Sequence, residues 1–145
     1  MNIVNQSLWQ HYQSTQFLLT QRLSNHFSFA IITAHNPQGD KLTSCQNRLL
    51  DKQLLRTIMQ LKRPYRALVG AAPDLSHMEK SWAVFIEKEQ ALDLGRQFKQ
   101  HAIYYVDRGK LFLIGCAQPD AQEVEMGQFD QRLSIVNELP DLIDD

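Results

Sequence analysis

The chain has 145 residues, of which 43% are hydrophobic and 21% are charged, and this suits one soluble domain, residues 1–145, with a sizeable core. Its 15 lysines and arginines nearly balance 16 aspartates and glutamates, which leaves a formal charge of −1. This balance argues against a protein that binds nucleic acid or membrane surfaces through an overall basic charge, although a local basic patch stays open.

The N-terminus and the cysteines indicate a cytoplasmic protein. The opening "MNIVNQSLWQHYQ" lacks the cationic start and apolar run of a signal peptide, and no segment has the apolar length needed to cross a bilayer. Cys45 and Cys116 are far apart and lack C-x-x-C spacing, which argues against a disulfide framework or a zinc knuckle. We therefore expect a cytoplasmic protein with no membrane contact and no cofactor.

The first predicted elements are a helix and a strand. Residues 1–26 are predicted to be a helical segment, and four apolar side chains lie near one face of that helix: Leu8, Trp9, Tyr12 and Leu19. Residues 28–34 are apolar on both alternations, which predicts a central strand with both faces covered. Pro37 removes a backbone donor and Gly39 favours a tight turn, so the strand should end near His35 or at the next residue.

A long helix should follow. The run "TSCQ" from Thr43 has the form of a capping box, in which the hydroxyl and the glutamine amide satisfy free N–H groups at the helix start. Four residues then form an apolar stripe: Leu50, Leu54, Ile58 and Leu61. Pro64 should end the helix.

The remaining elements are two strand pairs around a second helix. "YRALVGAAP" from Tyr65 and "SWAVFIE" from Ser81 predict an antiparallel pair because their connection is short. Gly95 lies within the next helix, where glycine costs about 1 kcal/mol relative to alanine, so we expect it to allow close contact with the sheet. "HAIYYV" and "LFLIGCA" flank a hairpin turn at Asp107, Arg108 and Gly109.

This order of elements predicts an α+β fold whose core spans residues 27–117. Its middle has the β-α-β-β-α-β order of a ferredoxin-like unit. We therefore expect a two-layer sandwich, with an antiparallel or mixed sheet, two main helices on one face, an N-terminal helix and an extra C-terminal strand. Residues 118–145 turn polar and end in "ELPDLIDD", which predicts a partly flexible, solvated acidic tail in preference to a docking motif.

Hydrogen-bonding residues gather where the central strand gives way to the long helix. Asn47 lies on the buried side of that helix, and an unpaired buried amide costs about 1–3 kcal/mol, so it must pair with protein, water or ligand. Thr33 and His35 alternate to the same side, and Asn36 lies at the chain break. The pattern predicts either a ligand pocket, where free N–H groups favour an anion or a carbonyl oxygen, or an Asx turn at Asn36 braced by Asn47.

Residues 29–106 resemble an uncharacterised family of short bacterial proteins, a domain of unknown function. In that family's pattern a strand ends in threonine, alanine, any residue, asparagine and proline; a serine and an asparagine follow on a helix, then a glutamate before a strand and Phe-x-Gln before another. The matching residues are Thr33, Ala34, Asn36, Pro37, Ser44, Asn47, Glu79, Phe98 and Gln100. Lys99 stands where the pattern has glycine. The resemblance implies no activity, but it implies that Thr33, Asn36, Asn47, Glu79 and Gln100 belong to one functional surface. With Ser44 added, our predicted ligand-binding residues are Thr33, Asn36, Ser44, Asn47, Glu79 and Gln100.

Catalysis has weaker candidates, so we leave open whether the chain is an enzyme. Glu79 is the best acid or base and His35 the second, but a solvated Glu79 paired with Lys80 is an equal alternative. "HME" from His77 matches the H-x-E of zinc deaminases without their P-C-x-x-C, so we predict no metal site. Cys45 at the helix start could be a thiolate with His35 as its base, although packing on the apolar side of the helix is the stronger interpretation.

We therefore expect a small polar or anionic ligand, a nucleotide or metabolite, where the central strand meets the long helix. Gln100 would contact this ligand or bond exposed helix carbonyls. The alternative is a protein-interaction or nucleic-acid-binding module without catalytic activity, which uses the acidic tail or the rings of Tyr104, Tyr105 and Phe112. Tyr104 and Tyr105 alternate faces, so at least one should be core, and the RNP signature is missing.

Overall fold

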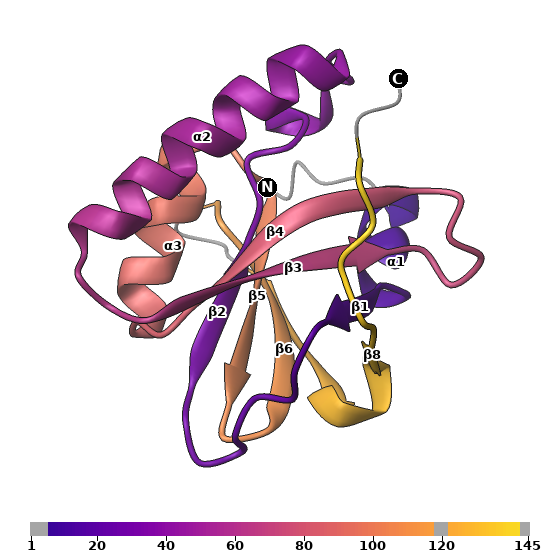
Figure 1. The fold of residues 1–145 in the computed structure, drawn as a ribbon, viewed down its shortest axis with the longest axis vertical. Helices are drawn as coiled ribbons and strands as arrows, with labels where there is room; N and C mark the ends of the chain where they lie inside the picture. The colour runs from indigo at the N-terminus through magenta and orange to yellow at the C-terminus, as the bar shows by residue number, and fades with distance from the viewer. Residues whose placement is uncertain (1–5, 118–121, 143–145) are drawn as a thin grey trace.

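The computed structural model describes residues 6–117 and 122–142 (Figure 1). Over these residues the chain forms three α-helices, eight strands and two 3-10 helices. In chain order the elements are α1 (Gln6–Gln13), β1 (Gln16–Leu19), β2 (Phe29–Ile32), η1 (Pro37–Gly39), α2 (Ser44–Gln60), β3 (Tyr65–Ala71), β4 (Met78–Val84), α3 (Lys88–Gln97), β5 (Ala102–Asp107), β6 (Lys110–Gly115), β7 (Glu123–Gln128), η2 (Phe129–Arg132) and β8 (Leu133–Ile135). Within the same ranges, every helix is too short or too polar to cross a bilayer.

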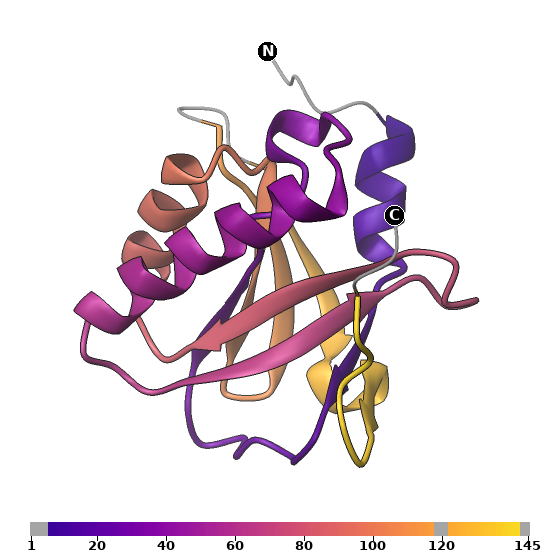
Figure 2. The same ribbon diagram turned by 45° about the horizontal axis from the view of Figure 1, so that its top comes forward.

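The strands form one sheet in the order β7-β6-β5-β2-β4-β3-β1-β8. In the described chain each neighbouring pair is antiparallel except β1 and β8, which run parallel. The sheet curls, and both views show α2 and α3 together on one side with α1 apart from them (Figures 1 and 2). The α+β class and a mixed sheet are therefore confirmed, but the sheet is larger than expected.

The sheet buries apolar side chains on both of its faces. Ala30 and Ile32 of β2 belong to the core beneath α2 and α3, whereas Phe29 and Ile31 belong to the core on the opposite face. The predicted central strand with two covered faces is thus confirmed, although β2 ends earlier than expected, at Ile32. α1 packs on the face opposite α2 and α3, where its Trp9 joins a small cluster on β5 and β6.

The N-terminal segment is only partly helical. The prediction of a helical segment over residues 1–26 is wrong in extent, because α1 ends at Gln13 and Leu19 lies in β1. Phe17 and Leu19 are buried there, and β1 pairs with β3. A run of four mostly apolar residues fits a helix stripe or a buried strand equally well. Here the run forms a strand because it hydrogen-bonds to the edge of β3.

α2 and α3 follow their predicted patterns. Thr43 caps α2, with its Oγ1 accepting from Gln46 N at 3.1 Å and its own N–H donating to Gln46 Oε1 at 3.0 Å, so the capping box is confirmed. In α3, a Cβ atom on Gly95 would lie 2.7 Å from Cγ2 of Ile103 and 2.8 Å from Sγ of Cys116. The expected close approach of this glycine to the sheet is therefore confirmed.

β5 and β6 form the expected hairpin. Arg108 and Gly109 join them with φ angles of 48° and 92°, both positive as a type I′ turn requires. Tyr104 and Tyr105 point to opposite faces as expected, and the hydroxyl of Tyr105 donates to the carbonyl of Ile86 at 2.9 Å within the core beneath the helices. Tyr105 is therefore a core residue.

The segment expected to be a polar tail, residues 118–145, contains β7, η2 and β8. Val124 and Met126 of β7 pack against the sheet, while Glu123 and Glu125 are exposed. This alternation is the pattern of an edge strand with one covered face. Two parts of the expected tail lie outside the described residues: 118–121 and 143–145.

Candidate functional site

A cavity of about 420 Å³ opens on the face of the sheet opposite α2 and α3. Four residues form its apolar floor: Phe17, Ile31, Ala102 and Leu113. Four of the five histidines line it: His11, His35, His77 and His101. Among the described residues, neither lysine nor arginine lines it, and Glu79 is its one carboxylate.

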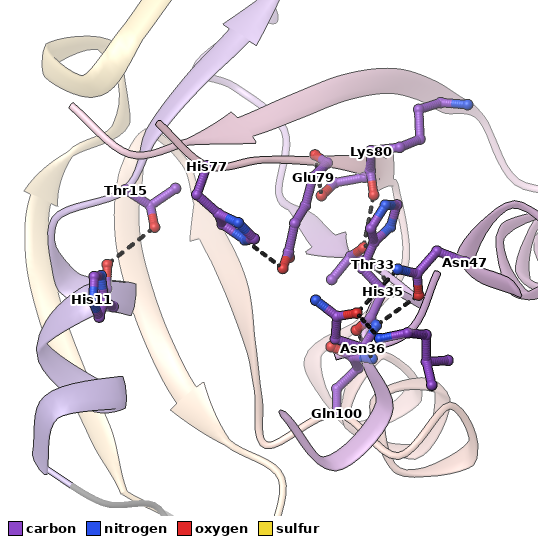
Figure 3. Close-up of polar contacts among 12 residues, drawn as sticks. His11, Thr15, Thr33, His35, Asn36, Asn47, His77, Glu79, Lys80 and Gln100 are labelled. Carbon is purple, nitrogen blue, oxygen red and sulfur yellow. Dashed lines mark hydrogen bonds and ion pairs between the residues drawn. The ribbon is translucent and has the colours of Figure 1, made fainter. Parts of the chain in front are cut away.

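Asn36 occupies the turn between β2 and α2 and presents its amide to this cavity. Its φ of 46° is left-handed, a conformation that asparagine tolerates better than most residues. Its Oδ1 accepts from the backbone N–H of Leu42 at 2.9 Å and from Nδ2 of Asn47 at 3.0 Å. Because a backbone N–H can only donate, these bonds fix which end of the amide is oxygen. Nδ2 of Asn36 then points toward the carboxylate of Glu79 (Figure 3).

Asn47 supports this turn from behind and does not line the cavity. It is 6% exposed, and its Oδ1 accepts from the backbone N–H of Asn36 at 2.9 Å. The expectation that this buried amide must be paired is confirmed, and its partner is protein. Of the two asparagines, only Asn36 lines the cavity.

Thr33 and His35 form a second fixed unit. The hydroxyl of Thr33 donates to the carbonyl of Lys80 at 2.7 Å and accepts from the backbone N–H of His35 at 3.1 Å. Its only hydrogen is thereby used, so Nδ1 of His35, 3.4 Å away, must be the donor if these two groups bond. Burial lowers the pKa of His35, which favours the neutral ring. Neutral His35 then carries its lone pair on Nε2.

Glu79 lies inside β4, not before it as expected, and its side chain faces the cavity. The suggested pairing of Glu79 with Lys80 is wrong, because successive strand residues point to opposite faces. Lys80 instead lies 3.3 Å from Oδ2 of Asp51 on α2. Glu79 Oε2 lies 2.9 Å from Nε2 of His77, and this hydrogen bond raises the pKa of His77 (Figure 3).

Gln100, in the segment that follows α3, braces the same turn. Its Nε2 donates to the carbonyls of His35 at 3.1 Å and Phe98 at 3.2 Å, so it bonds both the turn and the end of the helix. Lys99, where the resemblance has glycine, has a φ of 58°, the left-handed conformation that glycine favours. Its carbonyl accepts from the N–H of Gln38 at 2.7 Å, so the departure in sequence keeps a glycine-like backbone.

The opposite wall includes Tyr12, Thr15 and Tyr104, of which the sequence singled out only Tyr104 for a site, as a stacking ring for nucleic acid. The hydroxyl of Tyr104 donates to the carbonyl of Tyr12 at 2.6 Å and lies 2.8 Å from Oγ1 of Thr15. Burial, and then the charge of Glu79, raises the pKa of Tyr12 to about 12. No sequence signal showed that α1 would dock against β5.

Five predicted candidates line the cavity: Thr33, His35, Asn36, Glu79 and Gln100. Ser44 is the first residue of α2 and is not among the lining residues. Cys45 is exposed, so the expectation that it packs on the apolar side of α2 is wrong. Within residues 6–117 and 122–142, no three His, Cys, Asp or Glu side chains are grouped so that they could hold a metal ion.

Residues 32–103 match the model of a family described as "Protein of unknown function (DUF3293)". The resemblance to a domain of unknown function is thereby confirmed. The matched range includes the turn, β4 and Gln100, while α1 and Tyr104 lie outside it. No curated protein and no solved structure matches the chain.

Proposed function

We propose that this chain, which carries a DUF3293 domain over residues 32–103, binds a small polar ligand in the cavity. The contacts would come from Asn36, Glu79, His35 and Gln100. The observation that carries the proposal is the amide of Asn36, whose Oδ1 is fixed by two bonds while Nδ2 has no hydrogen-bond partner among the described residues. A donor oriented in this way toward a cavity is ready to bind a ligand acceptor.

The shape and chemistry of the cavity support a small-molecule site. Its volume of about 420 Å³ lies within the range of ligand pockets, and an apolar floor with a few convergent polar groups is typical of them. The polar groups are also rigid, because hydrogen bonds hold Thr33, Asn36 and Gln100 in place. Such preorganisation reduces the entropic cost of binding.

Of the polar and anionic classes expected from the sequence, the geometry supports the polar one. Glu79 puts a negative charge in the cavity, and the lining residues of the described chain include neither lysine nor arginine. At the start of α2, the N–H of Gln46 donates to Thr43, and Ser44 is not among the cavity residues. The negative charge in the cavity and the capped start of α2 both disfavour a phosphate group.

The proposal is tested by a thermal-shift screen of the whole chain against uncharged and charged metabolites, with Glu79→Gln and the exposed-site control Glu138→Gln. A compound at a hundred times its dissociation constant should add about 2.7 kcal/mol to the unfolding free energy. We expect hits that stabilise the parent and Glu138→Gln but not Glu79→Gln. A screen without hits, or hits indifferent to Glu79→Gln, would overturn the proposal.

We also propose that the elements from β2 to β5 form a ferredoxin-like unit. Its support is the strand order β5-β2-β4-β3, with each of these neighbouring pairs antiparallel and a helix after β2 and after β4. The remaining strands extend this unit on both sides.

A further inference from the structure

The fixed polar groups of the cavity are mostly acceptors. Glu79 Oε1 has no hydrogen-bond partner among the described residues. Gln100 has used its nitrogen on two carbonyls, so its Oε1 can only accept. When Nδ1 of His35 donates to Thr33 and the ring is neutral, its Nε2 is a third acceptor. Against these stands one fixed donor, Nδ2 of Asn36. The hydroxyl hydrogens of Thr33 and Tyr104 are already used on carbonyls, and His11 and His101 can take either role.

His77 shows from which kind of group the carboxylate of Glu79 accepts a hydrogen bond. An N–H on its planar ring bonds Glu79 Oε2 at 2.9 Å, and its side chain is 62% exposed against 27% for Glu79. It is the last residue of the turn that joins β3 to β4, so it approaches Glu79 from the rim. An N–H of a ligand can take this place when the imidazole swings out toward solvent.

Aromatic side chains contribute to the lining of the cavity. Tyr12, Phe17 and Tyr104 line it, and the rings of Phe17 and Tyr104 meet edge to face at 5.1 Å. Electron-rich ring faces favour flat, electron-poor or cationic groups. With Glu79 as the one carboxylate of the described lining, the electrostatics favour a neutral or positive ligand over an anion.

We infer that the ligand carries a flat group with adjacent N–H donors, as an amidinium, a guanidinium or an amino-substituted ring does. This inference rests on the proposed function and narrows it. One N–H donates to Glu79, and a second donates to Oε1 of Gln100 or Nε2 of His35, while an acceptor elsewhere on the ligand pairs with Nδ2 of Asn36. A carboxylate or phosphate head would leave these acceptors unpaired and would face the charge of Glu79.

The test compares benzamidine, benzamide and benzoate, which share one shape and differ in the head group. Each is titrated into the ¹⁵N-labelled full chain at pH 7.5, and the amide signals of His35, Asn36 and Gln100 are followed. We expect benzamidine to shift these signals with the lowest dissociation constant and benzoate with the highest. The benzamidine constant should rise at least tenfold in Glu79→Gln and stay unchanged in Glu138→Gln.

The outcomes separate this inference from the proposed function. Benzoate binding more tightly than benzamidine at the same residues would overturn the inference and leave the cavity as a binding site. If none of the three compounds shifts these signals, the inference is also overturned. The metabolite screen with Glu79→Gln would then be the test of the proposed function. Binding of benzamidine that survives in Glu79→Gln overturns the inference as well. The spectrum of each variant confirms that it is folded.

Discussion

Asn36 and Asn47, 11 positions apart in sequence, exchange two hydrogen bonds: Asn47 accepts from the backbone of Asn36 at 2.9 Å and donates to its side chain at 3.0 Å. The pair locks the turn between β2 and α2. These bonds also explain why a polar residue lies on the buried side of α2. The amide of Asn47 pairs the backbone N–H of Asn36, whose backbone is left-handed.

Replacing Asn47 by alanine should therefore destabilise the fold. The backbone N–H of Asn36 would lose its acceptor, and a buried group left without a partner costs about 1–3 kcal/mol. Urea denaturation measures the loss, with Arg48→Ala on the exposed side of α2 as a control expected to change stability little. If Asn47→Ala were as stable as the parent, the bracing role of Asn47 would be refuted.

Gly95→Ala should change the stability of the fold, and the sign of that change shows whether α3 and the sheet can move apart. Helix propensity alone would stabilise α3 by about 1 kcal/mol, but the new methyl would meet Ile103 and Cys116 at 2.7 and 2.8 Å. Overpacking typically costs about 1–3 kcal/mol, so we expect a net loss of melting temperature. Adding Cys116→Ala should restore part of it, because it removes one of the two clashing atoms. A stabilised single variant would show that the sheet moves aside.

His35 and His77 should give opposite pH dependences of stability. Burial lowers the pKa of His35 below its ordinary 6.5, so its contribution is complete above that value and is lost as pH falls toward the folded-state pKa. The hydrogen bond to Glu79 raises the pKa of His77, so its contribution is complete below 6.5 and is lost as pH rises through the folded-state pKa.

These signs can be measured by urea denaturation between pH 5 and 8 for the parent, His35→Asn and His77→Asn. Relative to the parent, His35→Asn should remove a rise of stability with pH, and His77→Asn should remove a fall. Titration of the two imidazole rings by NMR gives the pKa values directly. Equal slopes in the two variants would contradict the assignment.

Arg132→Ala should loosen α1. Nη1 of Arg132 donates to the carbonyls of Gln13 at 2.6 Å and Thr15 at 3.2 Å, and hydrogen bonds from a charged donor contribute about 1.5–3 kcal/mol when buried, less at a half-exposed site. We expect faster amide hydrogen exchange in α1 with little change in α3. The exposed-site control Arg56→Ala should leave α1 unchanged, and unaltered exchange in Arg132→Ala would refute the link.

The strands and helices with strong periodicity could be predicted, and the weakly patterned ones could not. β2 and the capped start of α2 were evident because their apolar spacing and Thr43 act locally. β1 falls within the predicted N-terminal helix because four residues are too few to distinguish the two periods. β7 did carry a signal, with Val124 and Met126 alternating against glutamates, but its overall polarity concealed it.

At the site, sequence reasoning found the residues of one wall. Asn36 and Asn47 could be connected because both lie beside the same turn, and Glu79 and Gln100 joined them through a family resemblance. His11, Tyr12 and Thr15 were missed because their place in the cavity depends on where α1 docks. That docking is set by contacts with Tyr104 and Arg132, which are distant in sequence.

The parallel pairing of β1 with β8 can form only late in protein synthesis. Arg132 and Gln13 are 119 positions apart, so the ribosome must deliver almost all of the described chain before β1 gains its outer neighbour. Until then the outer edge of β1 displays unpaired backbone groups, which a second nascent chain could pair with. A chain stopped after residue 117, the end of the core expected from the sequence, would keep that exposed edge permanently and so should be prone to aggregation.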